Sequence, residues 1–192
     1  HKVKIISSGG TYAVIKKLGY ACTEVSAYTG FQEMLDGRVK TLHPKVHGGL
    51  LCLRDNPDHI KAAEEHDIAM IDLVVVNLYP FEETLASGAA EGEIIEKIDI
   101  GGIALIRAAA KNFRDVVCIP SRGQYGDLVA ALGDGMSTDL DFRRNMAGAA
   151  FGVSSGYDAA IGRWVREGGN PEVLSVLEST STPLRYGENP HQ

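Results

Sequence analysis

The sequence predicts an α/β fold, a three-layer α/β/α arrangement in which helices cover both faces of an open, mainly parallel sheet, as in Rossmann-like proteins. Residues 73–76 are a continuous apolar run, and continuity rather than alternation indicates a strand that is buried on both faces. Strand-like runs also alternate along the chain with segments of helical spacing. Such a sheet binds ligands at the carboxyl ends of its strands, so the loops after the strands are the candidate site.

The first half of this pattern begins with a short β-branched run. Residues 3–6 predict a strand, and residues 12–18 have the spacing of a helix that ends at Gly19. A second short strand is expected at residues 21–26. Residues 37–49 are polar, cationic and rich in Gly and His, so we expect them to form an ordered functional loop.

Later elements follow from the same signals. The Asp-Asn-Pro sequence at residues 55–57 is typical of a helix start, and Ile60 and Ala63 give the following segment an apolar stripe. Glycines weaken the last long helical segment, so a break is expected near residues 154–156. The remaining expected elements are helices at residues 103–111, 124–132 and 140–164 and a buried strand at residues 115–119.

Composition limits the class of protein. The 192 residues carry 19 basic and 25 acidic side chains, a formal charge of −6, and 44% of them are hydrophobic. That suits one globular domain, expected at residues 1–168, and a linker at residues 169–192. The acidic balance argues against a broad nucleic-acid surface, and no apolar run approaches the length of a membrane helix.

The three cysteines favour a reducing compartment. Cys22, Cys52 and Cys118 are odd in number and far apart, and no C-x-x-C pair occurs in the sequence. Neither a disulfide framework nor a structural zinc site is indicated. We therefore expect a cytoplasmic protein.

The turn Ser8-Gly9-Gly10-Thr11 follows the first predicted strand and opens a helix. Small residues there let backbone N–H groups and two hydroxyls converge on an anion, so the turn is a candidate phosphate site. The alternative is a tight turn with a Thr cap. The turn lacks the lysine of a Walker loop and the third glycine of the dinucleotide fingerprint, which makes ATP hydrolysis and nicotinamide chemistry poor interpretations.

Residues 36–49 are the densest polar segment. In an extended chain Arg38 and Lys40 point to the same side, a pairing that suits a phosphate or carboxylate. The alternative is a solvated basic loop. His43 and His47 have a spacing of four that could hold zinc on a helix, but Pro44 opposes a helix there and no carboxylate completes the set, so we expect no metal site.

Two further candidate segments lie later in the chain. Asn77 and Tyr79 come directly after the buried run and could read a heterocycle, although an amide that satisfies backbone groups and a packed phenol would look the same. Asp99 precedes a helix, so it is first an N-cap candidate, with Gly101 allowing a ligand close to the backbone. A straight helix would separate Asp99 from Lys111 by about 18 Å. Either that helix is interrupted or Lys111 serves another site.

Four strings occur in an order typical of one family. They are D-G-R-V-K-T-L-H-P-K-V-H-G-G at residues 36–49, V-V-N-L-Y-P-F at 75–81, I-D-I-G-G at 98–102 and R-A-A-A-K-N at 107–112. Together they resemble the IMP cyclohydrolase domain of the bifunctional purine-biosynthesis family, which has a methylglyoxal-synthase-like fold. Residues 185–192, R-Y-G-E-N-P-H-Q, look like the entry to that family's AICAR transformylase domain. Transformylase activity is not expected from this chain alone.

The resemblance implies dehydrative ring closure of formyl-AICAR to IMP, a purine ribotide, without metal, cofactor or covalent intermediate, in a homodimer. It places catalysis at Lys40, Tyr79, Asp99 and Lys111, with the Lys40 and Thr41 N–H groups facing an oxyanion. It also implies substrate contacts from one set of residues: Ser8, Gly9, Gly10, Thr11, Arg38, Thr41, Asn77, Ile100, Gly101 and Gly102.

The sequence departs from the family pattern in one respect, and two other functions are alternatives to the cyclohydrolase. Family members begin with another strand, a Ser- and Lys-bearing loop and a helix, so we expect this domain to lack its first strand and helix, which would form the centre of the sheet. One rival is a noncatalytic module of the same fold that senses a phosphorylated ligand. The other is a methylglyoxal-synthase-type lyase, which would want extra carboxylates beside the phosphate turn.

Overall fold

The computed structural model describes residues 3–133 and 137–166, and the linker expected at residues 169–192 lies outside them. Two parallel strand pairs form the β structure. β1 (Ile6–Ser7) pairs with β2 (Thr23–Glu24), and β3 (Leu73–Val75) pairs with β4 (Val117–Ile119). The predicted mixed α/β class with parallel strands is confirmed. Within the described residues the two pairs share no hydrogen-bonded ladder, so two separate two-stranded sheets stand where the sequence predicted one open sheet.

The first elements follow the predicted order but with different ends. Helix α1 (Gly9–Lys17) begins directly after β1. The strand expected at residues 21–26 stops at Glu24, because the Glu24 carboxylate accepts a hydrogen bond from the Ser26 N–H at 2.6 Å and so caps helix α2 (Val25–Thr29). A single 3₁₀ turn, η1 (Leu35–Gly37), follows.

The loop expected at residues 37–49 is wrong from Pro44 onward, where helix α3 (Pro44–Leu51) begins. Pro44 occupies the first helical turn, where its missing N–H costs nothing, and the argument that it opposes a helix therefore fails. His43 lies just outside as the N-cap, and its Nδ1 accepts from the Lys45 N–H at 3.1 Å.

The later helices were mostly predicted. Asn56 caps α4 (Pro57–Glu65) through its side-chain oxygen, as expected from the sequence. Two short helices, α5 (Phe81–Ala86) and α6 (Glu91–Ile95), were not expected. The rest are α7 (Ile100–Lys111), the 3₁₀ turn η2 (Arg122–Gln124), α8 (Tyr125–Gly133) and α9 (Leu140–Val165).

Helix α9 runs for 26 residues without the break expected at residues 154–156. Ser154 is fully buried, and its Oγ accepts a hydrogen bond from Arg107 Nη1 at 3.3 Å. A glycine in a helix costs only about 1 kcal/mol relative to alanine. Burial of this face against α7 outweighs that cost.

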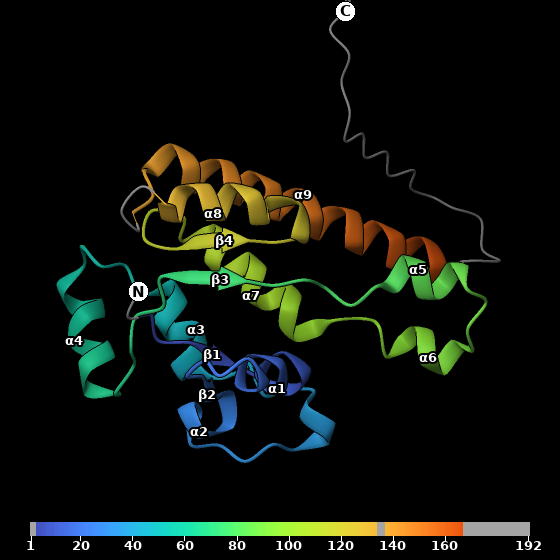
Figure 1. Cartoon of the computed structure of the whole chain (residues 1–192), viewed down its shortest axis with the longest axis horizontal. Coiled ribbons are helices and arrows are strands. Elements are labelled where there is room, and N and C mark those ends of the chain that lie inside the picture. Colours follow the sequence, from blue (N-terminus) through green and yellow to red (C-terminus); the bar gives the residue numbers. More distant parts are fainter. Residues whose placement is uncertain (1–2, 134–136, 167–192) are drawn as a thin grey trace, which may run out of the picture.

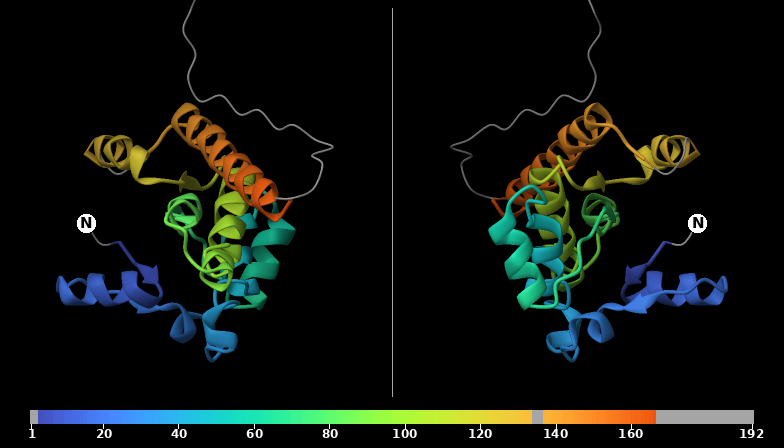
Figure 2. Two further views of the ribbon diagram at one scale, coloured as in Figure 1. Left: turned by 90° about the vertical axis from the view of Figure 1, so that its right-hand side faces the viewer. Right: turned by 90° about the vertical axis from the view of Figure 1, so that its left-hand side faces the viewer.

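Two hydrophobic clusters hold the fold together. The main cluster packs α7 between α3, β3, β4 and the first half of α9, and includes Leu50, Ile106 and Ala109. A second cluster of Phe81, Ile94 and Ala160 joins α5 and α6 to the end of α9. In Figure 1, α9 spans the molecule from the β4 side to the α5 side. Figure 2 shows α1 projecting from the body of the fold.

Cys118 of β4 illustrates how closed the main cluster is. Its side chain is 1% exposed, and burial raises the pKa of this thiol to about 12. A thiol with so high a pKa stays protonated at neutral pH and is a poor nucleophile. Cys118 is therefore a core residue.

Gly49 of α3 offers a direct test of the packing between α3 and the segment before β3. A Cβ added there would lie 2.4 Å from the backbone oxygen of Ala69 and 3.1 Å from Ile71 Cγ1. Because backbone cannot move aside cheaply, we expect Gly49→Ala to lower the free energy of unfolding by about 1–3 kcal/mol.

Gly148→Ala on α9 is the matched control, since an added Cβ there meets nothing within 4 Å. It should raise the free energy of unfolding by about 0.5–1 kcal/mol through helix propensity alone. Urea denaturation of both variants measures the two changes. Equal effects would contradict the packing described for Gly49.

Candidate active site

The turn after β1 opens α1 in the way the sequence predicts. Ser8 is extended (φ −141°, ψ 163°), Gly9 has a left-handed φ of 53°, and the helix starts at Gly9. Within the described part of the chain the Ser8 side chain makes no capping hydrogen bond. The first N–H groups of a helix have no partner inside it, so this turn presents donors to an anion.

The segment that carries Arg38 and Lys40 is shaped by a left-handed turn. Leu35, Asp36 and Gly37 have successive φ values of 52°, 53° and 79°. For a residue other than glycine this conformation costs roughly 1–2 kcal/mol, so surrounding contacts must hold it. Strain of this kind is found where a chain is held for function.

Lys40 links this segment to the turn after β1. Its Nζ lies 3.9 Å from Glu33 Oε1. A Cβ added to Gly9 would lie 3.7 Å from the same Nζ, and one added to Gly37 would lie 3.0 Å from it. The Lys40 side chain is 23% exposed. An ammonium group therefore sits between two glycine turns, beside the exposed first N–H groups of α1.

Thr41 joins these residues to the start of α7. A Cβ added to Gly101 would lie only 2.6 Å from Thr41 Oγ1, so the glycine permits this close approach. The predicted N-cap role of Asp99 is confirmed, because its Oδ1 accepts a hydrogen bond from the Gly102 N–H at 2.6 Å. Residues 8–11, 37–41 and 99–102 thus form one connected group, which we call the three-turn cluster.

Arg38 of this cluster and Tyr79 outside it both contact the link between α6 and α7. The Nζ of Lys97 lies 5.9 Å from the centre of the Tyr79 ring, within cation–π range. The Arg38 guanidinium forms an ion pair with the Glu96 carboxylate. Arg38 is therefore already paired with a carboxylate, and a phosphate group would have to compete with Glu96 for it.

Two predicted residues lie elsewhere. The Asn77 side-chain amide donates to the Tyr125 hydroxyl at 2.6 Å, which ties it to the start of α8. Helix α7 is continuous, so about 18 Å of helix separates the cap Asp99 from Lys111 at its far end. Of the two possibilities that the sequence left open, the structure therefore supports the one in which Lys111 serves another site.

Sequence reasoning missed four residues that contact the predicted ones. Glu33 faces Lys40, Glu96 pairs with Arg38, Lys97 lies over Tyr79, and Tyr157 binds the backbone at Asp99. Arg38 and Glu96 are 58 positions apart, as are Asp99 and Tyr157. Such pairs leave no local spacing signal.

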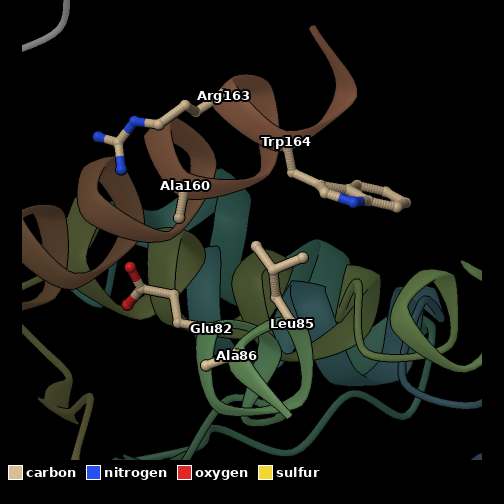
Figure 3. Close-up of a pocket in the computed structure, with 6 residues that line it drawn as sticks. All are labelled: Glu82, Leu85, Ala86, Ala160, Arg163 and Trp164. Atoms are coloured by element: carbon tan, nitrogen blue, oxygen red, sulfur yellow. The ribbon is translucent and has the colours of Figure 1, made fainter. Parts of the chain in front are cut away.

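Two hollows in the described part of the surface lie away from the three-turn cluster. One of about 260 Å³ lies between α5 and α9, where Figure 3 shows Leu85 rising toward α9 beside the Trp164 indole. A larger one, of about 650 Å³, lies on the α6 side of Trp164 and includes Ile94, Ile95 and Ile98. Neither is lined by a predicted site residue.

Among residues 3–133 and 137–166, no three His, Cys, Asp or Glu side chains are grouped so that they could hold a metal ion. In the same ranges no helix combines the length and apolar character needed to cross a membrane.

Two family models match the chain. The model described as an MGS-like domain matches residues 1–104. The model described as the AICARFT/IMPCHase bienzyme matches residues 109–192.

Relatives and a solved structure agree with these matches. The chain is 50% identical over 196 residues to the bifunctional purine biosynthesis protein PurH of Rhodospirillum rubrum, covering 100% of this chain and 37% of that protein. It is 51% identical over 191 residues to the PurH of Bacteroides thetaiotaomicron, covering 99% and 38%. The chain thus spans little more than a third of these relatives. The crystal structure of ForH matches with a TM-score of 0.68 and 29% identity, over 84% of this chain and 85% of that one.

Proposed function

Because this chain belongs to the MGS-like domain family and continues into the AICARFT/IMPCHase bienzyme family, we propose that it is an IMP cyclohydrolase. The proposed reaction closes the ring of formyl-AICAR with loss of water and gives IMP, the final step of purine synthesis. Relatives named as bifunctional purine biosynthesis proteins support the proposal.

The position of Lys40 is the observation that carries the proposal. The substrate is a phosphomonoester with about two negative charges, whereas the chain has a net charge of −6. An acidic protein must gather its positive groups where such a substrate binds. Lys40 provides such a positive group, since its ammonium group lies between the turn at Gly9 and the turn at Gly37.

The proposed chemistry needs an oxyanion site and proton transfer. The carboxamide nitrogen attacks the formyl carbon, the formyl oxygen gains negative charge, and a proton equivalent to the one lost by that nitrogen converts the oxyanion to a hydroxyl. As the carbon–hydroxyl bond breaks, the hydroxyl takes up a second proton and leaves as water, while the formamide nitrogen loses its proton and forms the C=N bond of the ring. We assign charge stabilisation to Lys40 and the N–H groups of Lys40 and Thr41. Tyr79 and Asp99 would orient the carboxamide and exchange protons with it. The step is intramolecular, so positioning supplies much of the acceleration.

Substrate binding is assigned to the same three turns. Residues 8–11 would hold the phosphate at the start of α1, and Arg38 would assist if the substrate displaces Glu96. Residues 100–102 would lie near the base, as would Asn77 if it exchanges its bond with Tyr125 for one with the purine. Lys111 has no place in this single-chain site. The proposed reaction uses no metal and no cofactor.

The assembly around this domain is also a proposal. The relatives are bifunctional proteins, so we propose that a transformylase domain accompanies this one in the whole protein. We further propose a homodimer that acts in the cytoplasm.

The test is to incubate the 192-residue chain with formyl-AICAR and follow IMP by its ultraviolet absorbance. Saturable formation of IMP is expected. Binding of IMP without turnover would instead favour a module that senses a phosphorylated ligand. Release of phosphate from dihydroxyacetone phosphate would favour the lyase.

A further inference from the structure

We propose that Tyr157 of α9 is a positioning residue for the cyclohydrolase reaction, holding Asp99 and Tyr79 at a fixed separation. The inference rests on the proposed function and deepens it. Tyr157 lies 58 positions after Asp99 and belongs to none of the sequence motifs, yet it contacts both segments that carry the proposed proton-transfer groups.

The hydroxyl of Tyr157 fixes the segment before α7. It accepts a hydrogen bond from the Asp99 N–H at 2.9 Å and donates one to the backbone oxygen of Lys97. A phenol hydroxyl can both donate and accept a hydrogen bond, and the Tyr157 hydroxyl does both here. The same Asp99 is also held by its carboxylate, which accepts from the Gly102 N–H at 2.6 Å. Backbone and side chain of Asp99 are therefore anchored separately.

The ring of Tyr157 fixes the segment after β3. It meets the Phe81 ring edge to face, with centroids 6.1 Å apart and an interplanar angle of 69°. Phe81 is 1% exposed, and its N–H donates to the backbone oxygen of Tyr79 at 2.8 Å. Aromatic pairs of this geometry have a preferred separation, so the ring contact restrains the backbone at Tyr79.

Lys97 closes the link between the two segments. Its backbone oxygen accepts from the Tyr157 hydroxyl, and its Nζ lies 5.9 Å from the Tyr79 ring centre. Burial raises the pKa of Tyr157, so the hydroxyl keeps its proton and its bond to Lys97 at neutral pH. The Tyr157 side chain, on a 26-residue helix, thus fixes the separation of Asp99 and Tyr79.

Tyr157→Phe is the variant that isolates the hydroxyl, because phenylalanine keeps the ring against Phe81. We expect kcat for IMP formation to fall about tenfold, since a small misplacement of reacting groups is costly. KM should change less than about twofold, because residues 8–11 and Lys40 are held by other contacts. The Asp99 amide should exchange its hydrogen faster, as followed by NMR.

Tyr28→Phe is the matched control. Tyr28 is also a half-buried tyrosine, and its hydroxyl makes only a long contact of 3.5 Å with the backbone oxygen of Lys45. This variant should leave kcat and the exchange of the Asp99 amide unchanged. The melting temperature of both variants measures any general loss of stability, whereas loss of positioning lowers kcat and speeds exchange of the Asp99 amide in Tyr157→Phe alone, at temperatures where both variants are folded.

The outcomes separate the two proposals. Unchanged exchange of the Asp99 amide in Tyr157→Phe overturns the inference, as does a loss of kcat equal to that of Tyr28→Phe or a change in KM alone. A wild-type chain that forms no IMP overturns the proposed function and, with it, the positioning role of Tyr157 in that reaction. Amide exchange then still decides whether Tyr157 holds Asp99.

Discussion

Replacing Lys40 with alanine is expected to lower kcat for IMP formation by about 100-fold, the usual effect of removing one group that stabilises an oxyanion. The Lys40 Nζ is held between two glycine turns, 3.9 Å from Glu33 Oε1, so no other described lysine or arginine has this position. Alanine removes the charge but keeps the backbone N–H. Steady-state kinetics with formyl-AICAR measures the change.

His47→Ala is the comparison for Lys40→Ala. His47 belongs to the same basic segment but lies on α3, where its N–H donates to the His43 oxygen within the helix at 3.0 Å. Its loss should change kcat less than about threefold, in line with the small effect of most half-exposed substitutions. Small and equal effects from both substitutions would contradict the assignment of Lys40.

Asp99→Asn should be the second most damaging substitution, lowering kcat by about 100-fold, as expected for the loss of a proton-transfer group. Asparagine keeps a side-chain oxygen that can accept from the Gly102 N–H and is as good a helix cap as aspartate. The melting temperature should therefore change little, which separates the chemical effect from a folding effect. Kinetics and thermal unfolding on the same sample provide both numbers.

Asp139→Asn provides the control for Asp99→Asn. Asp139 caps α9 in the same way, with Oδ1 accepting from the Phe142 N–H at 2.7 Å, and it contacts none of the three turns. Its replacement should leave kcat at the wild-type value. If the two variants lose activity to the same degree, Asp99 acts only as a cap.

The sequence predicted those parts of the fold whose signals are local. The turn from β1 into α1, the buried strand β4 and the caps Asn56 and Asp99 follow from a few neighbouring residues each. The prediction that β3 is buried on both faces is wrong, because Val75 is 44% exposed. The expectation that Pro44 opposes a helix was wrong because a proline disrupts a helix interior but is accepted in the first turn, where Pro44 lies. Glycines near residues 154–156 predicted a break that burial of Ser154 prevents.

The sequence indicated candidate site residues but few of their contacts. Lys40, Thr41 and Gly101 do lie close, although of the three turns only residues 8–11 follow a strand, whereas residues 37–41 begin at the end of η1 and residues 99–102 follow α6. The ion pair of Arg38 with Glu96 and the bond of Asn77 to Tyr125 depend on the packing of distant helices. Periodicity carries no information on such contacts.

Helix α9 is uninterrupted and contributes residues to both hydrophobic clusters, so it connects the two clusters rigidly. At about 1.5 Å per residue its 26 residues extend over about 39 Å, with Ala147 and Ala150 packed in the main cluster and Ala160 in the second cluster. Tyr157 lies on the same helix and packs against Phe81 of the second cluster. A substitution in α5 or α6 that shifts this cluster should therefore also shift the Asp99 backbone to which the Tyr157 hydroxyl is bound.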